Sequence, residues 1–327
     1  MKINIVCPNS AKERLESCMP TALESAGSIE FSINGEEMAY DGVVVLQSTS
    51  GYNCSSLSCP RGNALLVVRE PQDILRMPAR YVRQFDHVLT PNRKVSGVHT
   101  IYSQFGQLWT VNRSYKELDA MAVPEKTKLI STVVSTKRVT KGHRFRFDLT
   151  QAIAQELGDA FDWYGRGVRK IEDKWDAIAP YKYHLVFENG QWPHYWSEKL
   201  TDAFVGFSMP IYVGCPNIID YFQSDAIVIL DARNLEKAIS QLKSIISDDP
   251  YDRSFHHLLA ARNKVIREYS LFHKLEKIIQ SHFCEKITAY RKIELGEFEN
   301  VAYRYSPEKM LRRLRYRLVK GVWSWNA

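Results

Sequence analysis

The sequence lacks several features that would place the protein in a membrane or in an oxidising compartment. No window holds about 18 uncharged apolar residues, the length that a membrane-spanning helix needs. The apolar run in the N-terminal "MKINIVCPNS" is too short for a signal peptide and predicts a buried strand instead. The six cysteines are dispersed, and the close pair Cys54 and Cys59 has neither zinc-type spacing nor a second pair. We therefore expect reduced thiols and a cytoplasmic location.

Internal repeats and low-complexity tracts are also absent. Hydrophobic residues make up 45% of the chain and charged residues 25%, as in a globular protein with a sizeable core. A chain of 327 residues is long enough for two domains of ordinary size.

The formal net charge of +7 is concentrated at one end of the chain. Residues 307–327 contain six basic residues and one acidic residue, so they carry +5 and the rest carries about +2. A nucleic-acid-binding protein should spread its positive charge along a face and carry a recognition motif. Nucleic acid is therefore not an expected partner.

Short apolar runs alternate with helical patterns along most of the chain. Several runs are continuous in Val, Ile and Leu, which is typical of strands covered by helices on both faces. The alternation predicts an α/β fold with parallel sheets. The predicted strands span residues 3–7, 42–48, 64–70, 128–135, 161–165, 184–189, 209–214 and 226–231, and the predicted helices between them include 144–157, 198–206 and 234–246.

A polar segment at residues 112–128, broken by Pro124, predicts a linker between two α/β units. We expect an N-terminal domain at residues 1–125, a second domain at 126–255 and a C-terminal helical region at 256–327. Two such domains would face each other across a cleft at the carboxyl ends of their strands.

Polar residues gather at the end of one predicted strand and at the start of the next helix. Glu188 and Asn189 follow the apolar run "HLVF". Ser197 is a predicted N-cap, with Glu198 and Lys199 in the first turn. A helix N-terminus with an added lysine suits a phosphate, and a carboxylate suits sugar hydroxyls. The pattern predicts a pocket for a sugar nucleotide.

The stretches "YKYHLVFEN", "YWSEKLTDAF" and "PIYVGCPN" resemble the donor-binding signature of the α-1,3-fucosyltransferases, glycosyltransferase family ten. That signature reads Phe-Glu-Asn-Ser, then Tyr-x-Thr-Glu-Lys, then Pro-x-x-x-Gly-x-Pro. The resemblance implies a GT-B architecture of two Rossmann-like domains with C-terminal helices. It also implies inverting transfer of a sugar, usually L-fucose from GDP-fucose, to a glycan acceptor.

The resemblance assigns roles to residues of this sequence. Tyr195, Glu198 and Lys199 would bind the donor, within a motif that also contains Glu188, Asn189 and Ser197. A further arginine, at the start of the first helix of the donor domain, would contact the diphosphate; the spacing favours Arg146, with Arg144 as the alternative. The catalytic base would come from the N-terminal domain, where "LLVVREP" places Glu70 at a strand end.

Other interpretations of these residues stay open. Glu198 and Lys199 could be an ordinary helix-end pair, Glu188 a strand cap and Glu70 a turn residue. Gly190 stands where the family usually has Ser, which leaves a different nucleotide-sugar donor as the alternative. No Asp-x-Asp pattern follows a predicted strand, so we expect no tightly bound metal or other cofactor, although added Mn²⁺ or Mg²⁺ could be stimulatory. We expect the nearby histidines to be structural, namely His143, His184 and His194.

The basic segment 307–327 has the pattern of an amphipathic helix. Its leucines recur at helical spacing, its arginines cover the other side, and Trp323 and Trp325 stand near its end. Such a helix suits the headgroup region of an anionic membrane, which would make the protein peripheral on the inner face. The alternative is a last helix that packs back across the domains.

Overall fold

The computed structural model describes most of the chain up to residue 295. The described residues are 1–23, 28–36, 40–47, 49, 54, 56–70, 75, 77–95, 98–138, 141–286 and 289–295. The predicted amphipathic helix at 307–327 lies outside them.

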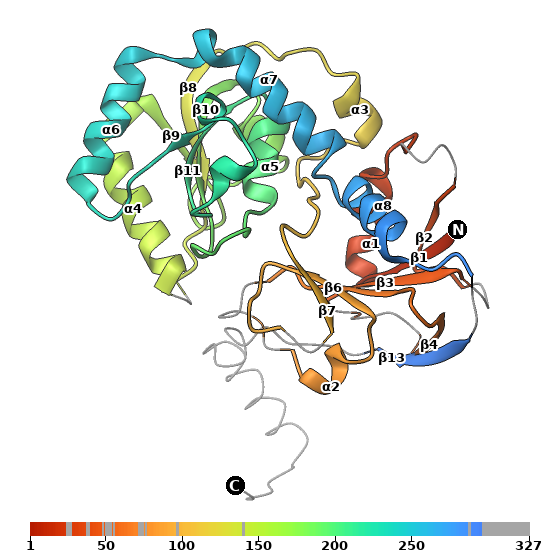
Figure 1. Ribbon diagram of the computed structural model, residues 1–327. Helices are drawn as coiled ribbons and strands as arrows, with labels where there is room; N and C mark the ends of the chain where they lie inside the picture. Colours follow the sequence, from red (N-terminus) through yellow and green to blue (C-terminus); the bar gives the residue numbers. More distant parts are fainter. Residues whose placement is uncertain are drawn as a thin grey trace, which may run out of the picture.

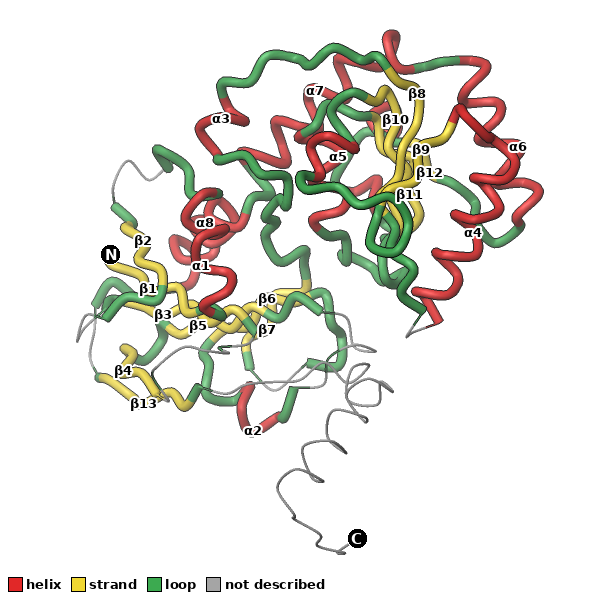
Figure 2. Tube along the Cα trace, turned by 180° about the vertical axis from the view of Figure 1, so that it is seen from behind, coloured by secondary structure: helices red, strands yellow, loops and turns green. Residues whose placement is uncertain are grey.

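The first unit is built on a parallel sheet with the strand order β2-β1-β3-β5-β6-β7. Every residue of β3 and β5 is buried, which explains why these runs are uniformly apolar. Helices α1 (Asn9–Ser17) and α8 (Leu271–His282) cover one face (Figures 1 and 2). Helix α2 (Ala79–Val82) and a two-stranded sheet formed by β4 (Ser56–Pro60) and β13 (Tyr290–Glu294) lie on the other. The strands are β1 (Lys2–Val6), β2 (Glu30–Ile33), β3 (Gly42–Leu46), β5 (Ala64–Val67), β6 (His87–Thr90) and β7 (His99–Tyr102).

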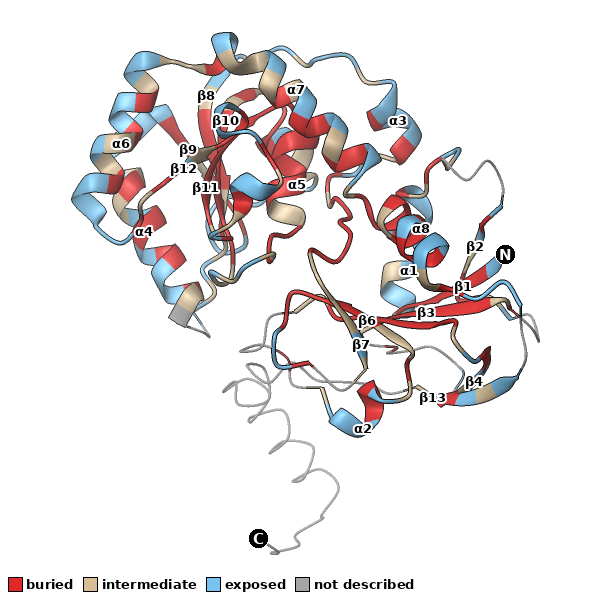
Figure 3. Ribbon diagram, viewed as in Figure 1, coloured by how far each residue is buried: buried red, intermediate tan, exposed pale blue. Residues whose placement is uncertain are grey.

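The second unit repeats this plan with a parallel sheet in the order β12-β11-β10-β8-β9. Helices α4 (Lys141–Leu157) and α6 (Leu235–Asp248) cover one face, and α5 (Glu198–Val205) and α7 (Tyr251–Arg267) cover the other (Figure 1). The central strands β10 and β11 are almost entirely buried, whereas the outer sides of α4 and α6 are exposed (Figure 3). The strands are β8 (Lys128–Val133), β9 (Phe161–Tyr164), β10 (Tyr181–Phe187), β11 (Met209–Val213) and β12 (Val228–Ile229).

The predicted α/β class with two Rossmann-like sheets is confirmed. Each of the eight predicted strands is present, with ends shifted by a few residues. In the first sheet the prediction missed β2, β6 and β7, which are four-residue strands at or next to its two opposite edges and carry polar residues. Such strands lack the long apolar run on which the prediction depended.

The chain crosses between the two units twice, and the two crossings touch. On the first crossing, which also carries α3 (Tyr115–Asp119), the N–H of Gln107 donates to the carbonyl oxygen of Tyr269 at 2.7 Å. The N–H of Leu271 donates back to the Gln107 carbonyl oxygen at 2.8 Å. Gly106 has φ +81°, and a Cβ there would lie 2.8 Å from the Leu271 Cα, so the close approach requires glycine.

The second crossing returns the chain to the first unit. Helix α8 packs there through Phe272, whose ring lies 5.5 Å from that of Phe31. After α8, strand β13 (Tyr290–Glu294) pairs antiparallel with β4 (Ser56–Pro60), a strand pair that the predicted helical region did not include. Among the described residues, no helix is both long and apolar enough to cross a membrane.

Candidate active site

A cavity of about 250 Å³ lies between the two units, at the carboxyl ends of their strands. The first unit contributes residues that follow β1, β3 and β5, and the second contributes the segment that leads into α5. This is where parallel α/β sheets usually bind ligands. The predicted site residues that line the cavity are Glu70, Tyr195, Ser197 and Glu198.

Glu188 holds the start of α5 in place. Its carboxylate accepts hydrogen bonds from the Ser197 N–H at 2.7 Å and from the Ser197 hydroxyl at 2.6 Å. Ser197 is the N-cap of α5, as predicted, and its oxygen accepts from the Lys199 N–H at 3.4 Å. Glu188 therefore pairs with Ser197, as the alternative interpretation expected. This pairing fixes the end of α5 that faces the cavity.

Lys199 lies among acceptors in the same network. Its Nζ is 2.9 Å from the Ser197 Oγ, 3.1 Å from a Glu198 oxygen and 3.6 Å from a Glu188 oxygen. Burial alone would lower the pKa of Lys199, but the carboxylates of Glu198 and Glu188 outweigh it and raise the pKa above its ordinary value. The cation is therefore permanent at neutral pH.

The pKa values of the two carboxylates beside Lys199 are shifted in opposite directions. Burial would raise the pKa of Glu198, yet Lys199 and Lys174 hold it well below the usual range. Burial raises the pKa of Glu188, although Lys199 opposes the shift. Glu198, which lines the cavity, is thus the ionised acceptor.

Arg146 and Arg144 have different environments on α4. Arg146 is buried and donates to the Asn189 Oδ1 at 3.1 Å, which joins both residues to the site. Its buried Nε has no partner among the described residues, and a buried donor of this kind favours an acceptor supplied by a ligand. Arg144 is exposed, and its guanidinium donates to the Arg138 carbonyl oxygen at 3.3 Å. The structure brings Arg146 to the site and leaves Arg144 outside it.

Glu70 faces the same cavity from the first unit. Its Oε2 is buried and has no partner among the described residues, and burial raises its pKa although Lys199 lowers it. The Gln47 Oε1 holds this turn by accepting from the N–H groups of Arg69 at 2.8 Å and Glu70 at 3.0 Å. A carboxylate with a raised pKa and a free oxygen can accept a proton.

The family assignment rests on residues 123–302, which match the sequence model for glycosyltransferase family 10 (fucosyltransferase), C-terminal part. The match spans more than half of the chain and includes Arg146 and the network around Lys199. The chain belongs to this family. Glu70 lies outside the matched span, so its place in the site depends on the geometry above.

This family member matches one fucosyltransferase in sequence over a short segment, and it aligns with solved glycosyltransferase structures over most of its length. It is 34% identical over 74 residues to the alpha-(1,3)-fucosyltransferase FucT of Helicobacter pylori, a match that covers 22% of this chain and only 16% of that relative. A solved alpha1,3-fucosyltransferase with GDP aligns over 84% of this chain and 92% of its own, with 16% identity and a TM-score of 0.48. A glycosyltransferase from Rickettsia africae aligns over 86% and 97%, with 10% identity and a TM-score of 0.47.

The family member has a second cavity, of about 320 Å³, beside the first part of α4. It is lined by Phe145 and Phe187, by the Glu188–Asn189 pair and by Arg233. Phe145 is 44% exposed, so its ring is accessible to a planar ligand in this cavity. The sequence analysis missed this cavity, because its lining comes from four separate segments.

Gly190 borders this second cavity and explains one departure from the family pattern. A Cβ at position 190 would lie 2.8 Å from the Trp192 Nε1, so a serine would displace the indole. Gly190 and Trp192 are thus a matched pair in the segment between β10 and α5.

Arg69 and Gln47 are two further residues of the site that the sequence analysis did not identify. Arg69 lines the cleft between two carboxylates, Glu70 and Glu198, and its Nε has no partner among the described residues. Gln47 has φ +46°, a backbone conformation that is rare outside glycine. Both residues stand at the ends of predicted strands, and that position was the sequence feature that could have marked them as site residues.

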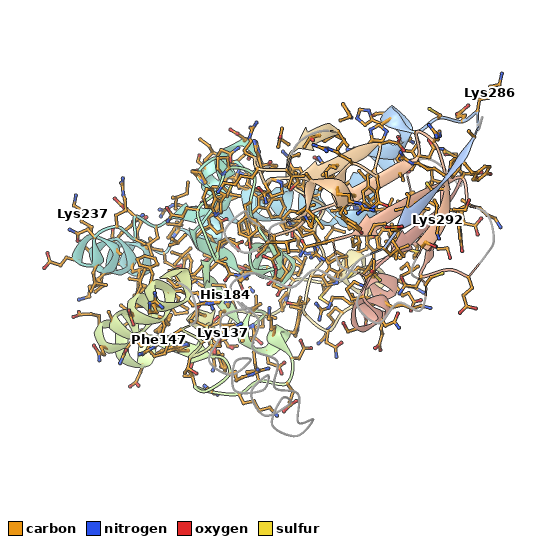
Figure 4. The ribbon with its side chains drawn as sticks, turned by 90° about the horizontal axis from the view of Figure 1, so that it is seen from below. Lys137, Phe147, His184, Lys237, Lys286 and Lys292 are labelled. Carbon is orange, nitrogen blue, oxygen red and sulfur yellow. The ribbon has the colours of Figure 1, made fainter. Side chains whose placement is uncertain are left out.

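The three histidines near the site have lowered pKa values or form hydrogen bonds with neighbouring side chains. Burial lowers the pKa of His143 to about 4 and that of His184 to about 3. His184 lies within the second unit and forms a 2.8 Å hydrogen bond with the Ser131 hydroxyl (Figure 4). His194 forms a hydrogen bond with the Tyr221 hydroxyl at 2.6 Å.

Proposed function

We propose that this family member transfers L-fucose from GDP-fucose to a hydroxyl of a glycan acceptor, with inversion at the anomeric carbon. The observation that carries the proposal is the pairing of opposite functions across one cleft. Glu70 contributes from the first unit a carboxylate with a raised pKa, whose Oε2 has no partner among the described residues. The half-buried Lys199 and the buried Arg146 contribute cations from the second.

In the proposed reaction, the acceptor oxygen forms a bond to the anomeric carbon as the bond to the β-phosphate oxygen breaks. The acceptor proton passes to Glu70. The departing GDP gains negative charge, which Lys199, Arg146 and the N-terminus of α5 stabilise. One displacement on the face opposite the leaving group gives inversion.

The second cavity suits the nucleoside of the donor. It meets the diphosphate site at Glu188 and Asn189, and Phe145 and Phe187 offer aromatic surface for a base. The solved relatives include an alpha1,3-fucosyltransferase with GDP-fucose, which supports this donor. The alternative is another nucleotide sugar handled by the same mechanism, because the Gly190–Trp192 pair departs from the family pattern beside the donor site.

We also propose that no tightly bound metal acts in the cleft, because two cations of the chain are placed to neutralise the diphosphate. Added Mn²⁺ or Mg²⁺ would then change the rate modestly by shielding phosphate charge.

GDP should raise the melting temperature of the protein. A ligand that binds only the folded state stabilises it by about 2.7 kcal/mol when its free concentration is a hundred times its Kd. The measurement is thermal unfolding with GDP, and with UDP and ADP as matched controls. GDP should give the largest shift, and the absence of a shift with every nucleotide would contradict the proposed function.

A separate prediction concerns the basic segment 307–327, which lies outside the described residues. We propose that it binds an anionic membrane surface from the cytoplasmic side. Truncation after Tyr305 should abolish sedimentation with vesicles of anionic lipid at low salt and leave GDP binding intact. Neutral vesicles serve as the control. Failure of the full chain to bind anionic vesicles, or loss of folding on truncation, would show that the segment packs against the domains instead.

A further inference from the structure

Three histidines lie together at the edge of the first sheet that faces away from the cleft. His87 and His99 are the first residues of β6 and β7, and the two strands pair them directly in register. His282 is the last residue of α8. The cleft lies at the carboxyl ends of these parallel strands, so the histidines at their amino ends are separate from the donor site.

The ring nitrogens of this histidine cluster, His87, His99 and His282, have nearly the spacing of metal ligands. The Nδ1 atoms of His87 and His99 are 3.1 Å apart. Two nitrogens bound to one tetrahedral Zn²⁺ at 2.0–2.1 Å would be about 3.3 Å apart. One ring nitrogen from each of the three residues lies within 4.8 Å of the others. A shift of His282 by about 1.5 Å would bring its nitrogen to the same spacing, on the ligand distances above.

The hydrogen bond from His87 to Gly62 leaves the His87 Nδ1 without a proton, so that its lone pair points to the His99 Nδ1 and could instead bind a cation. The His87 Nε2 lies 3.2 Å from the carbonyl oxygen of Gly62, and because a carbonyl oxygen only accepts, Nε2 carries the proton. Metal-binding histidines commonly donate their second N–H to a backbone carbonyl in this way, which fixes the tautomer. The His87 ring also stacks on the Phe283 ring, with the two ring centroids 6.0 Å apart and an interplanar angle of 22°.

The side chains around the cluster determine which ligand type it offers. Asp86, the residue before His87, uses its Oδ2 to accept from the Arg291 guanidinium at 2.5 Å and from the Ala64 N–H at 3.0 Å, and it is not among the grouped ligand atoms of the described residues. The ligand set is therefore imidazole, which suits zinc and its transition-metal neighbours better than Mg²⁺ or Ca²⁺.

We propose that His87, His99 and His282 bind one divalent transition-metal ion of the zinc class, with water as the fourth ligand. The ion would connect the end of α8 to β6 and β7. It would thereby stabilise the packing of α8, which follows the second crossing, on the first unit. Its role would be structural, because none of the three metal-binding histidines lies at the cleft. The segment after the cluster leads away from the second unit, with Lys286 at the far end of the molecule (Figure 4).

The test uses the full chain without a histidine tag, stripped with a chelator and then titrated with Zn²⁺ by calorimetry. We expect one ion per chain and a higher melting temperature with Zn²⁺ than in chelator. His99→Ala and His282→Ala should each weaken Zn²⁺ binding at least tenfold. Both variants should melt like the parent in chelator, because His99 is exposed and His282 half-buried. Co²⁺ should give the visible absorption of a tetrahedral site in the parent and lose it in both variants.

Two matched variants separate the cluster from other metal-binding groups. His256→Ala removes an exposed histidine of α7 and should leave Zn²⁺ binding unchanged. Cys284→Ser removes the exposed thiol that lies near Gly62 and should retain the site. Absence of stoichiometric Zn²⁺ binding, equal affinity in His99→Ala, or loss of binding in Cys284→Ser alone would overturn the proposal. The shift with GDP should persist in chelator, so failure here is distinguishable from failure of the proposed function.

Discussion

Replacing Lys199 by alanine should lower the rate of sugar transfer about a hundredfold or more. Lys199 is a permanent cation held within 3.6 Å of three oxygen-bearing side chains, so it is oriented before the donor arrives. A fixed charge at the departing β-phosphate stabilises the transition state more than the ground state, and loss of one such electrostatic contact costs about 10²–10³ in turnover. The measurement is kcat for GDP release at saturating donor and acceptor.

The control for this variant must separate chemistry from folding. Removing Lys199 leaves the buried Glu188 carboxylate without its cation, which destabilises the helix start. Lys199→Arg retains the charge and should recover part of the rate, while the melting curve of each variant shows whether it is folded. A folded Lys199→Ala protein with the turnover of the parent would show that the lysine does not act on the diphosphate.

Replacing Glu70 by glutamine should lower transfer by about 10²–10⁴ while GDP binding is retained. Glutamine keeps the shape and the backbone contacts with Gln47, but it cannot accept the proton of the acceptor hydroxyl. The variant should bind GDP with the affinity of the parent in calorimetry and should release GDP slowly in the presence of acceptor.

The pH dependence of the parent provides a second test of Glu70. Burial raises the pKa of Glu70, so its ionised, basic form is lost as the pH falls through a value above that of an ordinary carboxyl group. The rate of the parent should therefore fall on the acid side at a higher pH than a solvent-exposed glutamate would give, and Glu70→Gln should lack this limb. If Glu70→Gln retains both the rate and the limb, Asp73, which lies outside the described residues, becomes the candidate base and Asp73→Asn its test.

The sequence by itself determined the features that depend on neighbouring residues. Buried strands such as β3, β5 and β10 show as continuous apolar runs because each is covered on both faces. Ser197 is recognisable as a cap because the cap and the helix that it begins are contiguous. The motif around Glu188 and Lys199 was recognisable in the sequence for the same reason, and it led to the predicted donor side.

Only the tertiary structure decided the features that join distant segments. The sequence favoured Arg146 over Arg144 by spacing alone, and only the packing of α4 in the second unit shows that Arg146 lies beside Asn189 and Arg144 is exposed. The short strands β6 and β7 show no local pattern in the sequence, because their positions are fixed by pairing with strands elsewhere in the chain. His87, His99 and His282 likewise meet only because α8 returns across the first sheet, a contact between residues far apart in the chain that no local pattern encodes.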